Sequence, residues 1–208
     1  AGLIQLELLK IKTKYRQAIA LVDKALVNAA QREGLTVDEI AEMGIPNYGL
    51  DTVGYGEETM GDHIAQIQVV GFSNVELRWQ KSDGKVIKSI PAVVKSDYAD
   101  ELKDLKANIK DLKTMLSLQR QRIEQLFLRE RQWAYDEWLE RYVEHPVVGL
   151  FTRRVIWRLE QSDSVTLSRW RGEQLEGIEG KRVEVVPSAH TVHRGEPKMT
   201  RDERTQGG

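Results

Sequence analysis

The stretch DYADELKDLKANIKDLKTMLSLQRQRIEQLFLRERQWAYDEWLERYVE, residues 97–144, decides the fold that the sequence predicts. Seam residues recur in it at alternating steps of four and three, the spacing of a heptad seam on one side of a helix. Gln119 and Glu130 are polar interruptions of this seam. Because no Gly or Pro occurs before Pro146, one helix over Asp97–Glu144 is predicted. The seam positions are Tyr98, Leu102, Leu105, Ile109, Leu112, Leu116, Gln119, Ile123, Leu126, Glu130 and Trp133.

A helix of this length cannot bury its seam alone. It would span about 70 Å at the usual rise per residue. A turn near Gln119 would fold it into a helical hairpin; otherwise another segment of this chain, a longer parent chain or another protein has to cover the seam. The aromatic residues at its end favour a role as an internal strut against which β elements pack.

Two helices are predicted in residues 1–46. Gly34 ends the first, because glycine readily takes the left-handed conformation that closes a helix. Thr36 and Glu39 have the spacing of a capping box at the start of the second. The segment 36–45 resembles the first helix of a helix-turn-helix, but Pro46 stands where the recognition helix would have to begin. A capped packing helix is therefore the preferred interpretation.

Residues 47–95 are predicted to form a small antiparallel β-meander behind a glycine-rich loop. The loop spans 47–62, and its Gly54-Tyr55-Gly56 string lacks the spacing of a phosphate-binding loop. Apolar alternation over 64–70 and 75–79, and a returning strand over 86–90, predict the meander. Gly84 supplies the positive φ that the hairpin turn needs.

The segment 146–186 is predicted to hold a short helix, Val147–Arg154, and a second small β region. Strands are expected at 155–157, 165–167 and 182–186. The polar segment 187–208 is predicted to be a disordered tail. The fold class is accordingly α+β, with segments 1–46, 47–95, 96–145, 146–186 and 187–208.

Composition limits the classes of function. The 208 residues carry a formal net charge of -1, so there is no general attraction to nucleic acid or to an anionic membrane. Cysteine is absent, which excludes disulfides and thiolate metal sites and is compatible with the cytoplasm. No secretory signal or membrane-spanning run is recognisable, so no membrane partner is expected. Because the first residue is not Met, we expect a fragment of a longer protein.

The order of several short motifs resembles that of a known bacterial family. The motifs are Ile45–Asp51, Asp83–Lys85, Ile90-Pro91, Gln121–Glu124, Arg131–Trp133, His145-Pro146 and Arg153–Trp157. They resemble domain-of-unknown-function family 4132 over roughly residues 20–186. Some of its members are called molybdate metabolism regulators, and some carry a WGR domain. The resemblance implies no established reaction, and the WGR association hints at a nucleic-acid context. Ala189-His190-Thr191 departs from the family's His-Pro pair.

An arginine-rich region with interleaved tryptophans is the main candidate site. Arginine and aromatic side chains together can bind phosphates and stack on bases. The alternative is that the arginine stems cover apolar surface. The residues are Arg153, Arg154, Arg158, Arg169, Arg171, Trp157 and Trp170.

Histidines are weaker candidates. His145 is either a base near Arg153 and Arg154 or a helix-ending residue whose ring bonds a terminal carbonyl. His190 and His193 have the spacing of a metal pair but no third ligand nearby, so no metal or cofactor is expected.

The arginines of residues 97–144 have acidic residues nearby in sequence, which is typical of a solvated helix. They are Arg120, Arg122, Arg129 and Arg131.

The leading hypothesis is a non-catalytic scaffold or regulatory interaction segment that works through the helix seam. A nucleic-acid or phosphate-binding module that uses the arginine and tryptophan region is the first alternative. Part of an enzyme whose catalytic residues lie largely outside this chain is the second.

Overall fold

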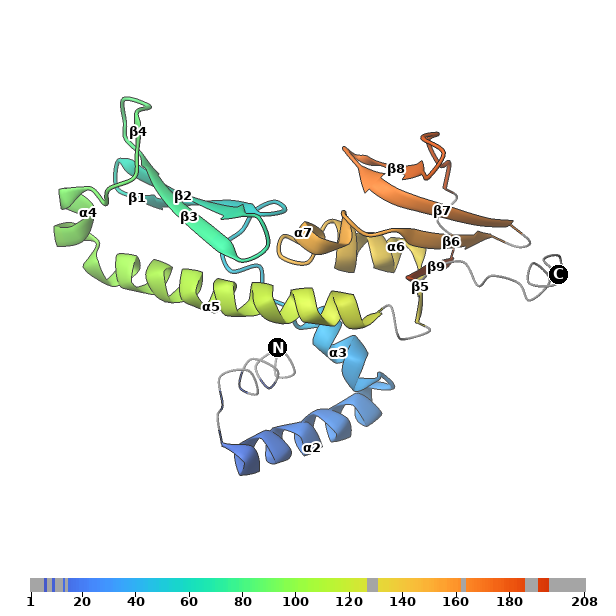
Figure 1. Cartoon of the computed structure of the whole chain (residues 1–208). Helices are drawn as coiled ribbons and strands as arrows, with labels where there is room; N and C mark the ends of the chain where they lie inside the picture. Colours follow the sequence, from blue (N-terminus) through green and yellow to red (C-terminus); the bar gives the residue numbers. More distant parts are fainter. Residues whose placement is uncertain are drawn as a thin grey trace, which may run out of the picture. The chain divides into compact units, whose positions relative to one another are not determined.

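The computed structural model has the predicted α+β class, with N-terminal helices, two antiparallel sheets and a long helix (Figure 1). It describes residues 6, 9, 13, 15–126, 131–161, 164–185 and 191–194. The chain divides into two compact units, Ala1–Tyr48 and Gly49–Gly208, and each is described by itself. Within the described residues, none of the helices is both long enough and apolar enough to span a membrane.

The first unit contains α2 (Arg16–Glu33) and α3 (Val37–Met43). Gly34 ends α2 with φ 68°, and its N–H donates to the Ala30 carbonyl, as predicted. The capping box of α3 is also confirmed, because the Glu39 N–H donates to the Thr36 hydroxyl and the Thr36 N–H donates to the Glu39 carboxylate. The core of this unit consists of Val22, Leu26, Ala30 and Ile40. Turns and then strand β1 follow α3, rather than a recognition helix.

Sheet A is a four-stranded antiparallel meander that begins the second unit. Its strands follow one another in chain order as β1 (Tyr55–Met60), β2 (His63–Val70), β3 (Asn74–Gln80) and β4 (Val86–Ile87). The predicted meander is therefore confirmed, with a shorter last strand.

The prediction of a loop over residues 47–62 was wrong in part, because β1 lies within that range and pairs with β2 along its whole length. Glutamates at two successive positions and Gly56 hide the alternation of this strand. Gly56 is needed because its backbone passes close to another segment. A Cβ there would lie 2.0 Å from the Gly49 carbonyl oxygen.

The long helix is α5 (Ala99–Gln125), which follows α4 (Ala92–Asp97). It runs through Gln119 without a break, so of the two alternatives left open by the sequence the structure has the continuous helix at that point and not the hairpin. Gln119 is buried and accepts a hydrogen bond from Arg122 Nε at 2.7 Å. The seam of α5 is buried within the chain, where the helix contacts β3 and α7. Its buried residues are Leu102, Leu105, Leu112, Met115, Leu116, Gln119 and Ile123.

The predicted continuation of this helix to Glu144 was also wrong. Strand β5 (Gln132–Ala134), helix α6 (Tyr135–Trp138) and a π-helical turn η2 (Leu139–Val143) follow instead, and then α7 (Gly149–Thr152). Burial of aromatic side chains explains the change, because tertiary packing overrides a weak local preference for helix. The Trp133 ring packs edge-on against Tyr142 at 4.9 Å between centroids and against Trp157 at 6.2 Å.

Sheet B has the strand order β5-β9-β6-β7-β8, in which β6 is Trp157–Gln161, β7 is Ser164–Arg171, β8 is Gln174–Gly177 and β9 is Thr191–Arg194. The prediction of disorder was wrong for Thr191–Arg194, because these residues form strand β9. Their polar neighbours in sequence give no sign of a strand, which is stabilised by pairing with β5 and β6. The remainder of 187–208 lies outside the described residues. Of the strand expected at 182–186, residues 182–185 have a single bridge, between Arg182 and Glu176, and residue 186 lies outside the described residues.

Glu58 makes the stability of the fold depend on pH. This half-buried carboxyl lies on β1, and burial, followed by the charges of Asp104 and Glu101 on α5, raises its pKa above the ordinary value. The folded state therefore binds the Glu58 proton more tightly than the unfolded state does, and ionised Glu58 destabilises the fold at neutral pH.

We expect Glu58→Gln to raise the melting temperature at pH 7 by removing this repulsion, with a gain in unfolding free energy of at most about 1 kcal/mol. The gain should fade as the pH falls through the raised pKa and vanish below the ordinary range of a glutamate. Thermal melts of both proteins from pH 7 to pH 4 measure this. Asp62→Asn, which neutralises an exposed carboxyl in the turn after β1, is the control. A gain that persisted at acid pH would contradict the assignment to charge.

Candidate interaction sites

The structure separates the predicted arginine and tryptophan region into several environments. Arg153 is half-buried, and its Nε donates to the Val143 carbonyl at 2.9 Å. Burial lowers the pKa of Arg153, and the charge of Glu144 partly offsets this effect. Arg154 is exposed, and its guanidinium lies 4.7 Å from the centre of the Phe72 ring. The two neighbouring arginines thus have different roles.

The other arginines of this region lie on sheet B, on the opposite face from the tryptophans. Arg158 pairs with Glu160 on its own strand. Arg169 and Arg171 both lie 3.7 Å from the Glu176 carboxylate. Each of these arginines therefore has a carboxylate close by.

The two tryptophans of the region belong to the inner side of sheet B. Trp157 has no exposed surface, and its Nε1 donates to the Thr152 carbonyl at 2.8 Å. Trp170 is half-buried, and its ring packs edge-on against Trp138 at 6.4 Å. Trp157 consequently has no face on which a base could stack. Anion binding by the remaining residues stays a prediction.

His145 acts on the turn that follows it. Its Nδ1 accepts hydrogen bonds from the N–H groups of Val147 at 3.1 Å and Val148 at 3.3 Å. The ring therefore caps backbone donors at the start of the turn before α7, whereas the sequence predicted a bond to a helix-terminal carbonyl. Among the described residues, no cluster of three or more potential ligands could hold a metal ion. His190 lies outside these residues, as does the side chain of His193.

The arginines predicted to decorate a solvated helix have mixed roles. Arg120 pairs with Glu124 at 2.9 Å as expected. Arg122 instead lies over the Tyr142 ring, 5.4 Å from its centre. Arg131 lies over Trp133 at 5.5 Å. Arg129 falls outside the described residues.

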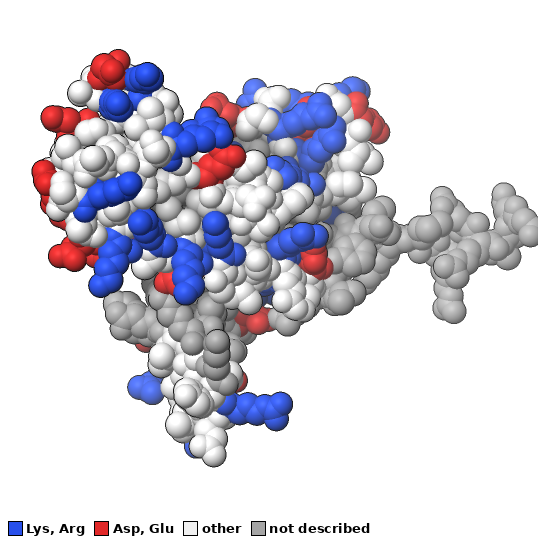
Figure 2. Space-filling model, turned by 60° about the vertical axis from the view of Figure 1, so that its left-hand side comes forward, with Lys and Arg blue, Asp and Glu red and all other residues white. Residues whose placement is uncertain are grey.

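A row of cations follows one exposed side of α5 (Figure 2). We call this set the cationic row; its members recur at helical spacing and all are exposed. In the described part of the molecule none of its four lysines has an ion pair, whereas its arginine pairs with Glu124. The members are Lys103, Lys106, Lys110, Lys113 and Arg120.

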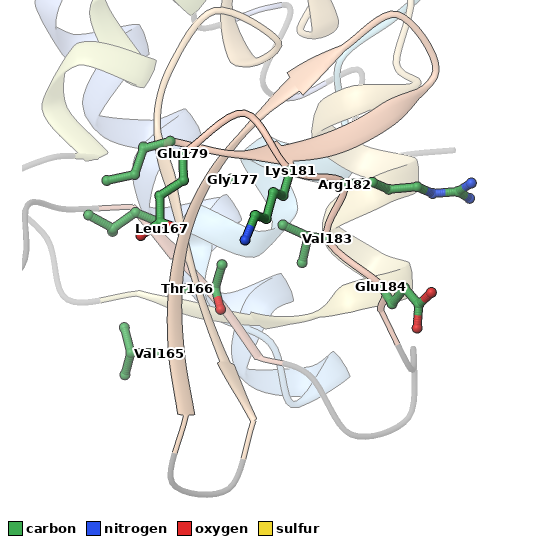
Figure 3. Close-up of a pocket in the computed structure, with 10 residues that line it drawn as sticks. Val165, Thr166, Leu167, Gly177, Glu179, Lys181, Arg182, Val183 and Glu184 are labelled. Carbon is green, nitrogen blue, oxygen red and sulfur yellow. The ribbon is translucent and has the colours of Figure 1, made fainter.

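A hollow of about 650 Å³ lies beside β7, between this strand and the segment that follows β8. We call it the β7 groove. Apolar side chains line it from both sides, among them Val165, Leu167 and Val183, and Figure 3 shows the Lys181 ammonium pointing between them. Arg182 and Glu184 point away from it in the same view. The groove thus combines an apolar surface with charged groups at its lining, among them Lys181 and Glu179.

The backbone of β7 is incompletely paired at this groove. Strand β8 pairs with β7 only from Ser168 to Arg171, and one further bond joins the Ile178 N–H to the Leu167 carbonyl. Because alternate residues of a strand bond to opposite sides, the N–H and carbonyl of Val165 point toward the β8 side. No strand pairs with them there in the described residues. A short free edge therefore borders the groove.

A second hollow, of about 420 Å³, lies over the polar face of sheet A. Tyr55 donates there to the Glu57 carboxylate, and this bond, together with burial and nearby negative charge, raises the pKa of Tyr55. Gln66 Nε2 also donates to Glu57, at 3.2 Å. These groups thus bond to one another across the polar face of the sheet.

Of the cationic row and the β7 groove, only the cationic row could have been found from the sequence. Counting lysines at helical spacing would have found the cationic row, since only α5 itself is needed to align them. The β7 groove has no comparable signal, because the free edge depends on where β8 stops pairing and on where residues 178–184 run.

Comparison with known proteins identifies one family. The model described as Domain of unknown function (DUF4132) matches residues 84–202. The match begins in the turn before β4 and includes α5 and all of sheet B. No curated protein and no solved structure matches the chain.

Proposed function

The chain belongs to the DUF4132 family, and from this premise we propose that it is a non-catalytic scaffold or regulatory interaction segment that binds an extended polypeptide in the β7 groove. The partner would be the remainder of a longer parent chain or another protein. A bacterial cytoplasmic setting, and a link to molybdate-regulator-like or WGR-associated proteins, belong to the same proposal.

The free edge of Val165 beside an apolar groove is the observation that carries this proposal. An added strand would gain main-chain hydrogen bonds from the edge and specificity from side-chain pockets, which is the usual mode of strand addition. Val165 and Ile178 are exposed by 52% and 61%, so the apolar surface that such a strand would cover faces solvent. Exposed strand edges are a recognised template for pairing with another chain.

The groove also indicates what the bound segment would contain. Val165 and Leu167 lie on one face of β7, so a paired strand would place alternate apolar side chains over them. Lys181 points into the same space and favours a carboxylate on the bound segment (Figure 3). The expected ligand is an extended peptide with alternating β-branched residues and one acidic side chain.

The helix seam is a less suitable docking surface than the sequence suggested. Leu112 and Leu116 have no exposed surface in the chain, so a partner that used the seam would first have to displace β3 or α7. The groove needs no such displacement. The interaction hypothesis is therefore kept, with its surface moved from α5 to sheet B.

A peptide-selection experiment tests this function. Peptides selected from a random display library on the chain should show alternating β-branched residues with an acidic position. Val165→Pro should weaken their binding at least about tenfold, the effect of losing one well-formed hydrogen bond to a strand edge. Because Val165 N–H points away from β6, the sheet should tolerate this proline. Circular dichroism checks that the variant is folded.

Val165→Thr is the matched control, since it keeps both the backbone donor and β-branching. It should leave peptide affinity within a few-fold of the unmodified chain. Selection of no peptides, or of peptides whose affinity is insensitive to Val165→Pro in a folded variant, would refute binding at this edge.

A further inference from the structure

We propose that the cationic row of α5 and the neighbouring Phe72 ring form a binding site for single-stranded nucleic acid. The row would follow the phosphates, and Phe72 would stack on a base. This site is separate from the β7 groove, and of the arginine and tryptophan region that the sequence predicted as a site only Arg154 takes part in it.

The charge pattern of α5 is the first support. Lys103, Lys106, Lys110 and Lys113 recur at steps of three and four, so they share one side of the helix, and Arg120 continues the line. At the helical rise the line from Lys103 to Arg120 is about 25 Å long, enough to follow several phosphates. A series of exposed cations of this length, of which only Arg120 pairs with a carboxylate among the described residues, suits a flexible polyanion better than one small anion.

An aromatic platform at the Arg120 end is the second support. Phe72 stands in the turn between β2 and β3 and is 43% exposed. Arg120 lies 5.4 Å from the centre of its ring and Arg154 lies 4.7 Å from it. Phe151 stacks against it with the rings 18° from parallel. Three separate elements thus bring two cations to one exposed ring.

These two features together favour a single strand over a duplex. Aromatic side chains next to a basic path are the usual platform for unpaired bases, whereas bases of a duplex are already stacked on one another. The opposite side of α5 is packed on β3 and α7, so a single strand can lie along the exposed side without displacing either element.

The test uses the full chain and a fluorescein-labelled oligothymidylate of about 16 nucleotides, followed by fluorescence anisotropy at increasing salt. We expect binding whose log K falls linearly with log salt, by about 0.7 for each phosphate contact. Lys106→Gln with Lys110→Gln should flatten that slope by about 1.4, because two contacts are removed. The affinity at low salt should fall at least about tenfold.

Lys85→Gln with Lys88→Gln is the matched control, because these exposed lysines lie near β4 and away from the row. The control pair should leave both the slope and the affinity nearly unchanged. Equal losses in the row pair and the control pair would overturn the proposal in favour of non-specific attraction.

A separate variant tests the stacking role of Phe72. Phe72→Leu keeps an apolar side chain against Phe151 but removes the stacking face, and it should lower affinity about tenfold without changing the salt slope. A thermal melt confirms that the variant is folded. Absence of binding at low salt, a preference for duplex of the same length, or binding to vesicles that contain phosphatidylserine but not to the oligonucleotide would each overturn the proposal.

Discussion

Replacing Trp157 by Ala should lower the free energy of unfolding of the larger unit by about 3 to 5 kcal/mol, the usual cost of emptying a buried tryptophan site. Trp157 has no exposed surface and stands at the start of β6. Its ring packs edge-on against Trp138 at 5.3 Å and against Tyr142 at 5.9 Å. The change also removes the bond from its Nε1 to Thr152.

Urea unfolding followed by tryptophan emission measures this effect on the larger unit alone, because all five tryptophans of the chain lie in Gly49–Gly208. Trp157→Phe should cost less, since it keeps an aromatic ring in the cluster. Tyr15→Ala, which removes a ring that is 80% exposed in the smaller unit, should leave the transition where it is. A loss below about 1 kcal/mol for Trp157→Ala would mean that the aromatic cluster does not hold sheet B to α6.

Gly56→Ala should destabilise the larger unit by about 3 kcal/mol, because the new methyl group has no space. Its Cβ would lie 2.0 Å from the Gly49 carbonyl oxygen and 2.8 Å from the Leu50 Cα. Both obstacles are backbone atoms, so no side-chain rotation can relieve them. For a protein of this size the expected fall in melting temperature is about 10 °C.

Gly177→Ala provides the matched comparison for the same chemical change. Gly177 also lies buried in a strand, but the nearest atom to its added Cβ would be the Lys181 carbonyl oxygen at 3.6 Å, an ordinary contact distance. We expect its melting temperature to change by only about 2 °C. Equal effects for both glycines would show that loss of backbone freedom, and not the close approach at Gly56, is what matters.

Local signals predicted much of the first half of the fold. Gly34 and the Thr36–Glu39 capping box act within a few residues, so the ends of α2 and α3 follow from sequence alone. The β-meander likewise follows from alternation and from the glycine turn at Gly84. Strand β1 was missed because Gly56 is explained only by the Gly49 backbone beside it, a contact that sequence spacing does not reveal.

The second half depended on contacts that no local pattern contains. The heptad spacing continues through Glu130 to Trp133, yet α5 ends at Gln125 and Trp133 belongs to β5. The side chain of Trp133 is buried against Tyr142 and Trp157, which stand nine and 24 residues further along the chain. Periodicity therefore predicted the existence of the helix but not its end. The predicted arginine and tryptophan site was likewise not formed as one surface, because strand alternation places Arg158 and Trp157 on opposite faces of sheet B.

The place of β9 in sheet B bears on how the chain folds as it is synthesised. Sheet A pairs neighbours in sequence, so each of its hairpins can form as soon as its second strand has left the ribosome. Strand β5 has no such neighbour, because its partner β9 is made after β6, β7 and β8. Bringing β9 to β5 closes a long loop, and the loss of chain entropy comes before the strand pairing that offsets it. Trp133 and the unpaired edge of β6 would thus stay accessible to chaperones, or to another nascent copy, until Thr191–Arg194 emerges.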